Sequence, residues 1–398
     1  MSQRRIPAVY MRGGTSKGVF FHERDLPRPG PTRDALFARV LGSPDPYARQ
    51  TDGMGGATSS TSKVVVISES RRTDCDVDFL FGAVAIDTGL VDYSGNCGNL
   101  SAAVGPFAVL EGLVAPQEGM TRVRIWQRNL GQRIDALVPV RDGVVLEDGA
   151  FNEDGVAFCA AEVRLEFYGN EAGAAAAPLA PSTPAAMFPT GAAQEILQVP
   201  GVGALAVTLI SAGNPTVFVR AQALGLTGRE LPEDVNRDRR LLERLELVRA
   251  HAAVAMGLAE SSAEATRARP ATPKLAWIAH PANYRSSAGV EIAAERIDVL
   301  ARMVSMGKLH HAFTGTGSIA LAAAAATPGT VVNEVARTLP GVATRIGHVS
   351  GTLAVGAEVS QHGGVWQFDK AILSRSARRL MSGFVHVPAT GVLGKSYT

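Results

Sequence analysis

Two glycine-rich turns, one in each half of the chain, lead into runs of small apolar residues. The first turn is Ser94-Gly95-Asn96-Cys97-Gly98-Asn99, and the run Leu100-Ser101-Ala102-Ala103-Val104 follows it. The second turn is Thr314-Gly315-Thr316-Gly317-Ser318, and an alanine-rich run over residues 319–326 follows it. Each run predicts a buried helix, because a helix that is apolar on all sides has no face for water. The repetition predicts a chain of two similar halves, each with one such helix.

A second pair of turns supports the repeat. Arg12-Gly13-Gly14-Thr15-Ser16-Lys17-Gly18-Val19-Phe20 in the first half parallels Ala212-Gly213-Asn214-Pro215-Thr216-Val217-Phe218 in the second. We therefore expect pseudo-twofold packing, with two helix N-termini that face each other across a cleft. Such a cleft suits a di- or tricarboxylate, because the free N–H groups of a helix N-terminus favour an anion.

The chain is long enough for two domains. Its 398 residues are 46% apolar and 19% charged, so each domain can bury a core. Residues 170–186 are rich in Ala, Pro and Gly, which predicts a linker. We predict domains over residues 1–186 and 187–380, with the segment 381–398 packing back onto the first domain.

Hydrophobic patterning predicts a mixture of short strands and helices. The expected strands lie within residues 6–21, where a glycine turn separates two of them, and over 64–67, 74–81, 123–126, 133–138, 160–167, 204–210, 216–219, 275–279 and 290–293. The expected helices cover residues 34–41, 100–113, 237–256, 297–306 and 319–326.

Charge and cysteine content exclude several classes of protein. The net charge is only +2 and no Lys/Arg-rich block occurs, so we expect no nucleic-acid partner. No run of about 18 apolar residues indicates a transmembrane helix. The three cysteines are odd in number and widely spaced, which predicts neither a disulfide framework nor a zinc site. A cytoplasmic location fits this composition best.

Cys97 is the candidate catalytic residue that the sequence marks most clearly. It lies between two Gly/Asn pairs at the expected start of a helix. Free backbone N–H groups and the helix dipole favour negative charge there, and so favour a thiolate. The alternative is a small buried thiol that packs like alanine, which is our interpretation of Cys75 and Cys159. A thiolate beside an anion-binding turn indicates proton-transfer or acyl chemistry on a small acid.

Lys63 is the second candidate. It follows Ser59-Ser60-Thr61-Ser62 and precedes the strand-like run Val64-Val65-Val66-Ile67. It is either a solvated lysine at a strand end or an amine held in a cleft and suited to act as a base. The glycine-rich stretch before it does not match a phosphate-binding loop, because no Gly directly precedes the lysine and no Ser or Thr follows it.

Other turns offer further polar groups. Thr15, Ser16 and Lys17 place two hydroxyls and an amine between glycines, either to form the turn or to contact an anion. The turn that contains Ser350 is open to the same two interpretations. The adjacent His310 and His311 have no acidic neighbour, so we expect no metal site there.

Taken together, these motifs closely resemble the 2-methylaconitate cis–trans isomerase family, PrpF. The segments that carry the resemblance are Met11-Arg12-Gly13-Gly14-Thr15-Ser16-Lys17-Gly18, Asp52-Gly53-Met54-Gly55-Gly56, Ser59-Ser60-Thr61-Ser62-Lys63, Ser94-Gly95-Asn96-Cys97-Gly98-Asn99, Ala212-Gly213-Asn214-Pro215-Thr216, Ser305-Met306-Gly307-Lys308 and Gly347-His348-Val349-Ser350-Gly351. The resemblance implies an α+β, diaminopimelate-epimerase-like fold. In that fold two pseudo-symmetric domains each curl a β-sheet around a central helix, and the active site lies in the cleft between them.

The resemblance also implies a set of site residues. The family's lysine and cysteine carry over to Lys63 and Cys97 as the catalytic pair. Diaminopimelate epimerase uses a second cysteine where this chain has Thr314, so a symmetric two-thiol mechanism is not expected. The expected substrate-binding residues are Thr15, Ser16, Lys17, Ser62, Asn96, Gly98, Asn99, Asn214, Gly315, Thr316, Gly317, Ser318 and Ser350. No metal and no organic cofactor are implied.

The implied activity is the conversion of 2-methyl-trans-aconitate to its cis isomer through a dienolate, in propionate breakdown by the methylcitrate cycle. The alternatives are 4-oxalomesaconate tautomerisation, methylitaconate-type allylic isomerisation, cysteine-dependent acyl transfer, and a non-catalytic accessory role beside an aconitase-like enzyme. The expected partners are a small carboxylate substrate, an aconitase-like dehydratase and a second copy in a homodimer. Which of Lys63 and Cys97 removes the first proton stays open.

Overall fold

The computed structural model describes residues 3–169, 186–339 and 341–388 of the chain. Its helices are η1 (Glu23–Asp25), α1 (Pro31–Leu41), α2 (Gly98–Leu110), η2 (Ala221–Leu224), α3 (Pro232–Asn236), α4 (Arg239–Ala255), α5 (Ser262–Ala268), η3 (Ala294–Arg296) and α6 (Gly315–Ala326). Apart from residue 186, the predicted linker lies outside the described residues. Among the described helices, none combines the length and apolar composition needed to cross a bilayer.

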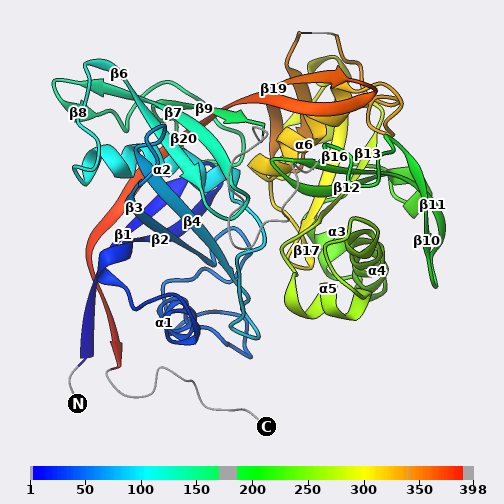
Figure 1. The fold of residues 1–398 in the computed structure, drawn as a ribbon. Helices are drawn as coiled ribbons and strands as arrows, with labels where there is room; N and C mark the ends of the chain where they lie inside the picture. The colour runs from blue at the N-terminus through cyan, green and yellow to red at the C-terminus, as the bar shows by residue number, and fades with distance from the viewer. Residues whose placement is uncertain (1–2, 170–185, 340, 389–398) are drawn as a thin grey trace.

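The strands form two lobes that lie side by side (Figure 1). Those of the first lobe are β1 (Gln3–Gly13), β2 (Ser16–His22), β3 (Lys63–Glu69), β4 (Val77–Val84), β5 (Val91–Asp92), β6 (Gly119–Gln127), β7 (Gln132–Arg141), β8 (Val144–Val145) and β9 (Glu162–Tyr168). Those of the second are β10 (Glu195–Val199), β11 (Gly203–Ala212), β12 (Asn214–Arg220), β13 (Lys274–Ala279), β14 (Tyr284–Arg285), β15 (Glu291–Ile292), β16 (Val299–Ser305), β17 (Lys308–Leu309), β18 (Thr344–His348) and β19 (Gly351–His362). The last strand, β20 (Val365–Pro388), pairs with strands of both lobes.

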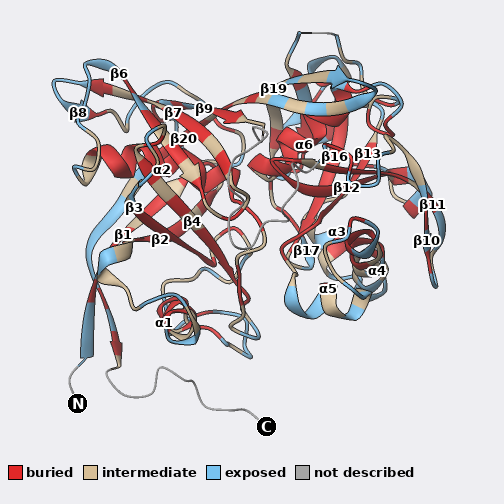
Figure 2. Cartoon of the chain, viewed as in Figure 1, coloured by how far each residue is buried: buried red, intermediate tan, exposed pale blue. Residues whose placement is uncertain are grey.

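The sheet of the first lobe closes on itself around α2. Strand pairing runs from β1 through β2, β3, β4, β6, β7 and β9 to β20, and β20 pairs with β1. The N-terminal Gln3 lies opposite Pro388 in this last pairing. Residues 98–109 of α2 are all buried inside this shell, as the red helix in Figure 2 shows. The outer face of β2 and β3 packs against α1.

The second lobe repeats the pairing order of the first. Strands β11, β12, β13, β16, β18 and β19 pair in the sequence antiparallel, parallel, antiparallel, parallel, antiparallel. Strands β1, β2, β3, β4, β6 and β7 pair in the same sequence. Residues 315–325 of α6 are buried against the inner face of this second sheet. The α+β class and the repeated halves expected from the glycine turns are therefore present, while the boundaries at residues 186 and 187 stay a prediction.

One predicted helix is wrong. Residues 297–306 form no helix, because residues 299–305 are the central strand β16. All seven residues of β16 are buried, and its neighbours are β13 and β18. A strand that is buried on both faces loses the alternation that identifies most strands, and its apolar run then resembles a buried helix.

Candidate active site

Cys97 caps the N-terminus of α2. Its side chain is only 7% exposed. The Leu100 backbone N–H donates a hydrogen bond to Sγ at 3.4 Å, and the Cys97 carbonyl accepts a hydrogen bond from Ser101 N–H at 2.9 Å. The thiol is therefore at the positive end of the helix, where a thiolate is favoured.

Lys63 lies directly beside this thiol. It is the first residue of β3, and its Nζ donates hydrogen bonds to Cys97 Sγ at 3.1 Å and to Ser16 Oγ at 2.9 Å. Strand β2, which carries Ser16, lies next to β3 in the parallel register that brings these groups together. Three predicted site residues thus form one hydrogen-bonded chain that can transfer or hold a proton.

The N-termini of α2 and α6 meet at the site. A Cβ atom on Gly98 would lie 2.7 Å from the Thr316 nitrogen, and one on Gly315 would lie 2.8 Å from the Gly98 carbonyl carbon. Cys97 and Thr314 cap the third and fourth amides of their helices. Within the described structure, the first two amides of each helix donate to no protein acceptor, and they belong to Gly98, Asn99, Gly315 and Thr316. Four amides are therefore free to bind carboxylate oxygens.

Asn214 joins the two lobes at this point. Its side chain accepts a hydrogen bond from Asn96 N–H at 2.8 Å and donates to Asn96 O at 2.9 Å and to Thr316 Oγ1 at 2.7 Å. The Asn96 Nδ2 is buried in the cavity wall without a protein acceptor. This amide is a further donor for a ligand.

Asn99 is held by a residue that the sequence analysis missed. Arg375 on β20 donates from Nε to Asn99 Oδ1 at 3.0 Å, and Asn99 Nδ2 donates to Thr15 Oγ1 at 2.9 Å. Burial lowers the pKa of the Arg375 guanidinium, although the nearby Glu153 carboxylate opposes this effect. Thr15 is thus connected to the N-terminus of α2 through Asn99, although it does not line the cavity.

Seven predicted substrate-binding residues do not line the cavity: Thr15 and Ser16, whose contacts are given above, and Lys17, Ser62, Gly317, Ser318 and Ser350. Lys17 alternates with Ser16 along β2, and its Nζ lies 5.4 Å from the centre of the Tyr10 ring. The Ser62 hydroxyl donates to Val84 O at 2.7 Å and accepts from Gln50 Nε2 at 2.7 Å. These two side chains are oriented away from the cavity and serve packing and local hydrogen bonding.

The remaining three also have structural partners. Gly317 packs against Met303, and its N–H donates to Thr314 Oγ1 at 3.2 Å. The Ser318 hydroxyl donates to Gly315 O at 2.7 Å, and the Ser350 hydroxyl donates to His311 O. Their expected role in direct substrate contact has no geometric support.

Two further residues near Lys63 were not predicted as site residues. Lys274, the first residue of β13, lines the cavity. His311 Nδ1 lies 3.4 Å from Ser60 Oγ, and burial followed by the charge of Lys63 lowers its pKa. His311 is therefore a neutral imidazole at neutral pH, and its ring stacks on that of His310. The described residues contain no group of three or more His, Cys, Asp or Glu arranged to hold a metal ion.

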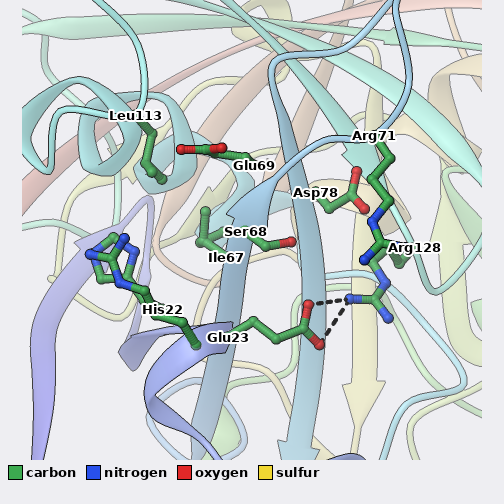
Figure 3. Close-up of a pocket in the computed structure, with 10 residues that line it drawn as sticks. His22, Glu23, Ile67, Ser68, Glu69, Arg71, Asp78, Leu113 and Arg128 are labelled. Atoms are coloured by element: carbon green, nitrogen blue, oxygen red, sulfur yellow. Dashed lines mark hydrogen bonds and ion pairs between the residues drawn. The ribbon is translucent and has the colours of Figure 1, made fainter.

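The cavity around Cys97 is narrow. It has a volume of about 30 Å³ and is formed by residues of both lobes. A larger pocket of about 570 Å³ lies on the first lobe alone (Figure 3). Among its charged groups, Arg128 and Glu23 form an ion pair at 3.0 Å. The smaller cavity is the candidate active site, because a thiol, two lysines and free helix amides converge there.

The chain matches the family model described as PrpF protein over residues 3–388. It is 53% identical over 394 residues to the 2-methyl-aconitate isomerase of Shewanella oneidensis, with 97% of this chain and 98% of the relative covered. It is 38% identical to the 4-oxalomesaconate tautomerase of Pseudomonas putida, with 97% of each covered.

Solved structures agree with this relationship. The crystal structure of methylitaconate-delta-isomerase matches with a TM-score of 0.74 and 38% identity, covering 100% of this chain and 99% of that one. A hydroxyproline epimerase from Agrobacterium vitis matches with a TM-score of 0.57, covering 98% and 95%. At 15% identity the second match concerns the fold alone. The expected diaminopimelate-epimerase-like fold is confirmed.

Proposed function

The chain belongs to the PrpF family, and on that premise we propose that this isomerase converts 2-methyl-trans-aconitate to 2-methyl-cis-aconitate in propionate breakdown. The observation that carries the proposal is the 3.1 Å contact between Lys63 Nζ and Cys97 Sγ beside four free helix amides. A proton acceptor and a proton donor in contact, next to anion-binding groups, suit allylic proton transfer on a small polycarboxylate.

The reaction needs no net oxidation or reduction. One of the Lys63–Cys97 pair removes a proton from the carbon next to the double bond, and the electron pair of that C–H bond moves into a dienolate. The former double bond is then single and rotates. The proton returns to the same carbon, which restores the double bond in the cis arrangement and regenerates the pair.

The free amides stabilise the intermediate. Negative charge moves onto a carboxylate oxygen as the dienolate forms, and fixed N–H donors stabilise it without having to reorient. The amides of Gly98 and Asn99 approach from one lobe and those of Gly315 and Thr316 from the other. A substrate with at least two carboxylates can use both sets.

The experiment that tests this proposal compares substrates. We expect kcat/KM for 2-methyl-trans-aconitate to exceed that for 4-oxalomesaconate. A preference of about tenfold for 4-oxalomesaconate, roughly 1.4 kcal/mol of transition-state discrimination, would assign the chain to the tautomerase branch instead. In deuterated water, deuterium in the product or recovered substrate would show directly that a C–H bond is broken. A methylitaconate-type activity would appear as a shifted double bond in the product.

Four further expectations accompany this function. Activity should survive prolonged chelation and dialysis; a loss that zinc or iron restores would contradict metal independence. We propose a cytoplasmic location and a functional partnership with an aconitase-like dehydratase, which a coupled assay with that enzyme tests. Light scattering after size-exclusion chromatography tests the proposed homodimer.

A further inference from the structure

Lys274 is a second buried lysine in the same cavity. Its side chain is 8% exposed, and its Nζ donates to Ser305 Oγ at 3.1 Å. Across the described residues it forms no ion pair with a carboxylate. Ion-pair or hydrogen-bond compensation is what normally keeps a buried ammonium group from destabilising a protein. The buried ammonium group of Lys274 therefore lacks a negatively charged partner among the described residues.

Strand pairing makes Lys274 the counterpart of Lys63. Each lysine begins a strand, β3 or β13, that runs parallel to the strand after the glycine turn, β2 or β12. Each lysine also lies at the start of an antiparallel pairing with the next strand: Lys63 lies opposite Ala83, and Leu275, the residue after Lys274, lies opposite Val304. The two lobes thus bring equivalent amines to one cavity.

The surroundings of the two lysines differ in one respect. Lys63 lies against Cys97, the cap of α2, whereas the cap of α6 is Thr314. A threonine hydroxyl cannot serve as a base toward a C–H bond near neutral pH. The half that contains Lys274 consequently lacks the thiol partner that proton transfer requires, and its lysine is left for binding.

Nearby protein carboxylates do not satisfy the amine. Asp92 is the acidic side chain with the greatest influence on Lys274, but its oxygens accept hydrogen bonds from Ser94 N–H at 2.7 Å and Ala271 N–H at 2.8 Å. Burial and then the charge of Lys63 lower the pKa of Lys274 to about 8. The amine is still mostly protonated at pH 7, so a ligand anion that reaches it would gain a strong, charge-assisted hydrogen bond.

We propose that Lys274 binds one carboxylate of the substrate and thereby selects for polycarboxylates, while Lys63 takes part in proton transfer. This inference rests on the proposed function, since it assumes a polycarboxylate substrate. Each lobe then supplies one ammonium group and two helix amides. Lys274 is a specificity-determining residue rather than a member of the acid–base pair.

The test combines removal of the lysine with removal of each ligand carboxylate. Itaconate, mesaconate and glutaconate each lack a different carboxylate of trans-aconitate. Calorimetry measures the binding of all four compounds to the Cys97→Ser protein and to the Cys97→Ser/Lys274→Met protein, where turnover does not interfere. We expect Lys274→Met to weaken trans-aconitate and two of the dicarboxylates by at least about 30-fold, roughly 2 kcal/mol. The third dicarboxylate, which lacks the carboxylate that Lys274 binds, should change by less than about threefold.

Kinetics provide a second readout. In otherwise native enzyme, Lys274→Met should raise KM for the substrate at least 30-fold and change kcat by less than fivefold, both on the order of one bound ion pair. Lys308→Met, at an exposed lysine on β17, is the matched control and should alter neither constant. Ser305→Ala, which removes the hydroxyl partner of Lys274, should produce the same ligand pattern with smaller changes.

The outcomes separate the two proposals. If the Cys97→Ser protein binds none of the four acids, the proposed function fails. If it binds trans-aconitate and Lys274→Met weakens all four ligands equally, or none of them, the carboxylate role of Lys274 is wrong. A loss of kcat with unchanged KM would also overturn the inference, because it would place Lys274 in the chemical step.

Discussion

The contact between Lys63 and Cys97 joins a buried amine to a buried thiol. Ser16 holds the amine from one side at 2.9 Å, and the first turn of α2 holds the thiol from the other. A proton shared by this pair can be given to or taken from a carbon atom with little rearrangement. The function of this pair therefore depends on the proton that it moves and on the charged groups around it.

Replacing either member of the pair should abolish most turnover. We expect Lys63→Met and Cys97→Ser each to lower kcat by at least about 100-fold, which is the typical contribution of a general acid or base. Steady-state kinetics measure the effect, and circular dichroism checks folding. Cys159→Ser, at the exposed free cysteine, is the control. Near-normal turnover in a folded Lys63 or Cys97 variant would contradict the two-residue mechanism.

The buried charge of Lys274 should lower the free energy of unfolding of the unliganded enzyme. Its pKa is about 8 in the folded protein and 10.5 in the reference state, so the unfolded chain binds more protons between these values. The contribution of Lys274 to the free energy of unfolding of the wild type therefore becomes less unfavourable as the pH increases from 8 to 10.5. Lys274→Met removes the buried charge and should increase the free energy of unfolding at pH 7 by about 1–3 kcal/mol.

Denaturant unfolding at several pH values measures this difference. The advantage of Lys274→Met should be largest below pH 8 and should decline toward pH 10.5. A constant difference across this range would mean that the substitution acts through packing alone. The charged or titratable groups near Lys274 are Lys63, Asp92, Cys97, Arg249 and His310.

At the scale of elements, the two buried helices work as a unit. The first turns of α2 and α6 approach so closely that only glycine fits at both contact points. Each helix thereby aims its free amides at the same small volume. Each helix is buried against the strands of its own lobe, which determine where its N-terminus lies.

Adding one methyl group at this contact should separate the helix ends. A Cβ on Gly315 would lie 2.8 Å from a backbone atom of Gly98, so the backbone must shift. We expect Gly315→Ala to lower kcat/KM at least about tenfold, since small displacements of catalytic groups have large effects on rate. Gly356→Ala on β19 is the control, because its Cβ would be 3.8 Å from the nearest side chain. Unchanged kcat/KM in Gly315→Ala would show that helix spacing is not critical.

Patterns of neighbouring residues in the sequence predicted α2 and α6 well, but they did not predict which strands pair with each other. The glycine turns and small residues identified α2, α6 and the thiol, because the relevant interactions lie within a few residues of each other. Lys17 was expected near the ligand, yet the two-residue period of a strand places it on the opposite face from Ser16. Lys274 was missed because its importance depends on the parallel pairing of β12 with β13, which no local pattern specifies.

In the whole molecule, the candidate active site is too small for its proposed substrate. The cavity of about 30 Å³ has space for about two waters, at roughly 10–15 Å³ each, and none for a tricarboxylate. Residues of both lobes form its wall, so we expect the lobes to separate when the substrate enters. Ser94 and Thr272 mark this boundary, where their hydroxyls form a 2.6 Å hydrogen bond between the lobes.

A reversible crosslink tests whether opening is required. The double substitution Ser94→Cys and Thr272→Cys places two thiols at this contact, where an oxidant should join them. We expect oxidised protein to lose at least about nine-tenths of its turnover and to regain it after reduction, as expected if opening gates each cycle. The same preparation before and after reduction is its own control. Full turnover in protein that is crosslinked by mass analysis would show that the substrate enters without lobe separation.

The pairing of β1 with β20 affects how the protein is made. Gln3 is synthesised long before its partner Pro388, because almost all of the described chain lies between them. Elongation proceeds at roughly 5–20 residues per second, so the first shell stays open throughout most of synthesis. During that interval β1 and β9 expose unpaired edges that can join other chains. A nascent chain that stalls before β20 is made therefore leaves the shell of the first lobe unclosed.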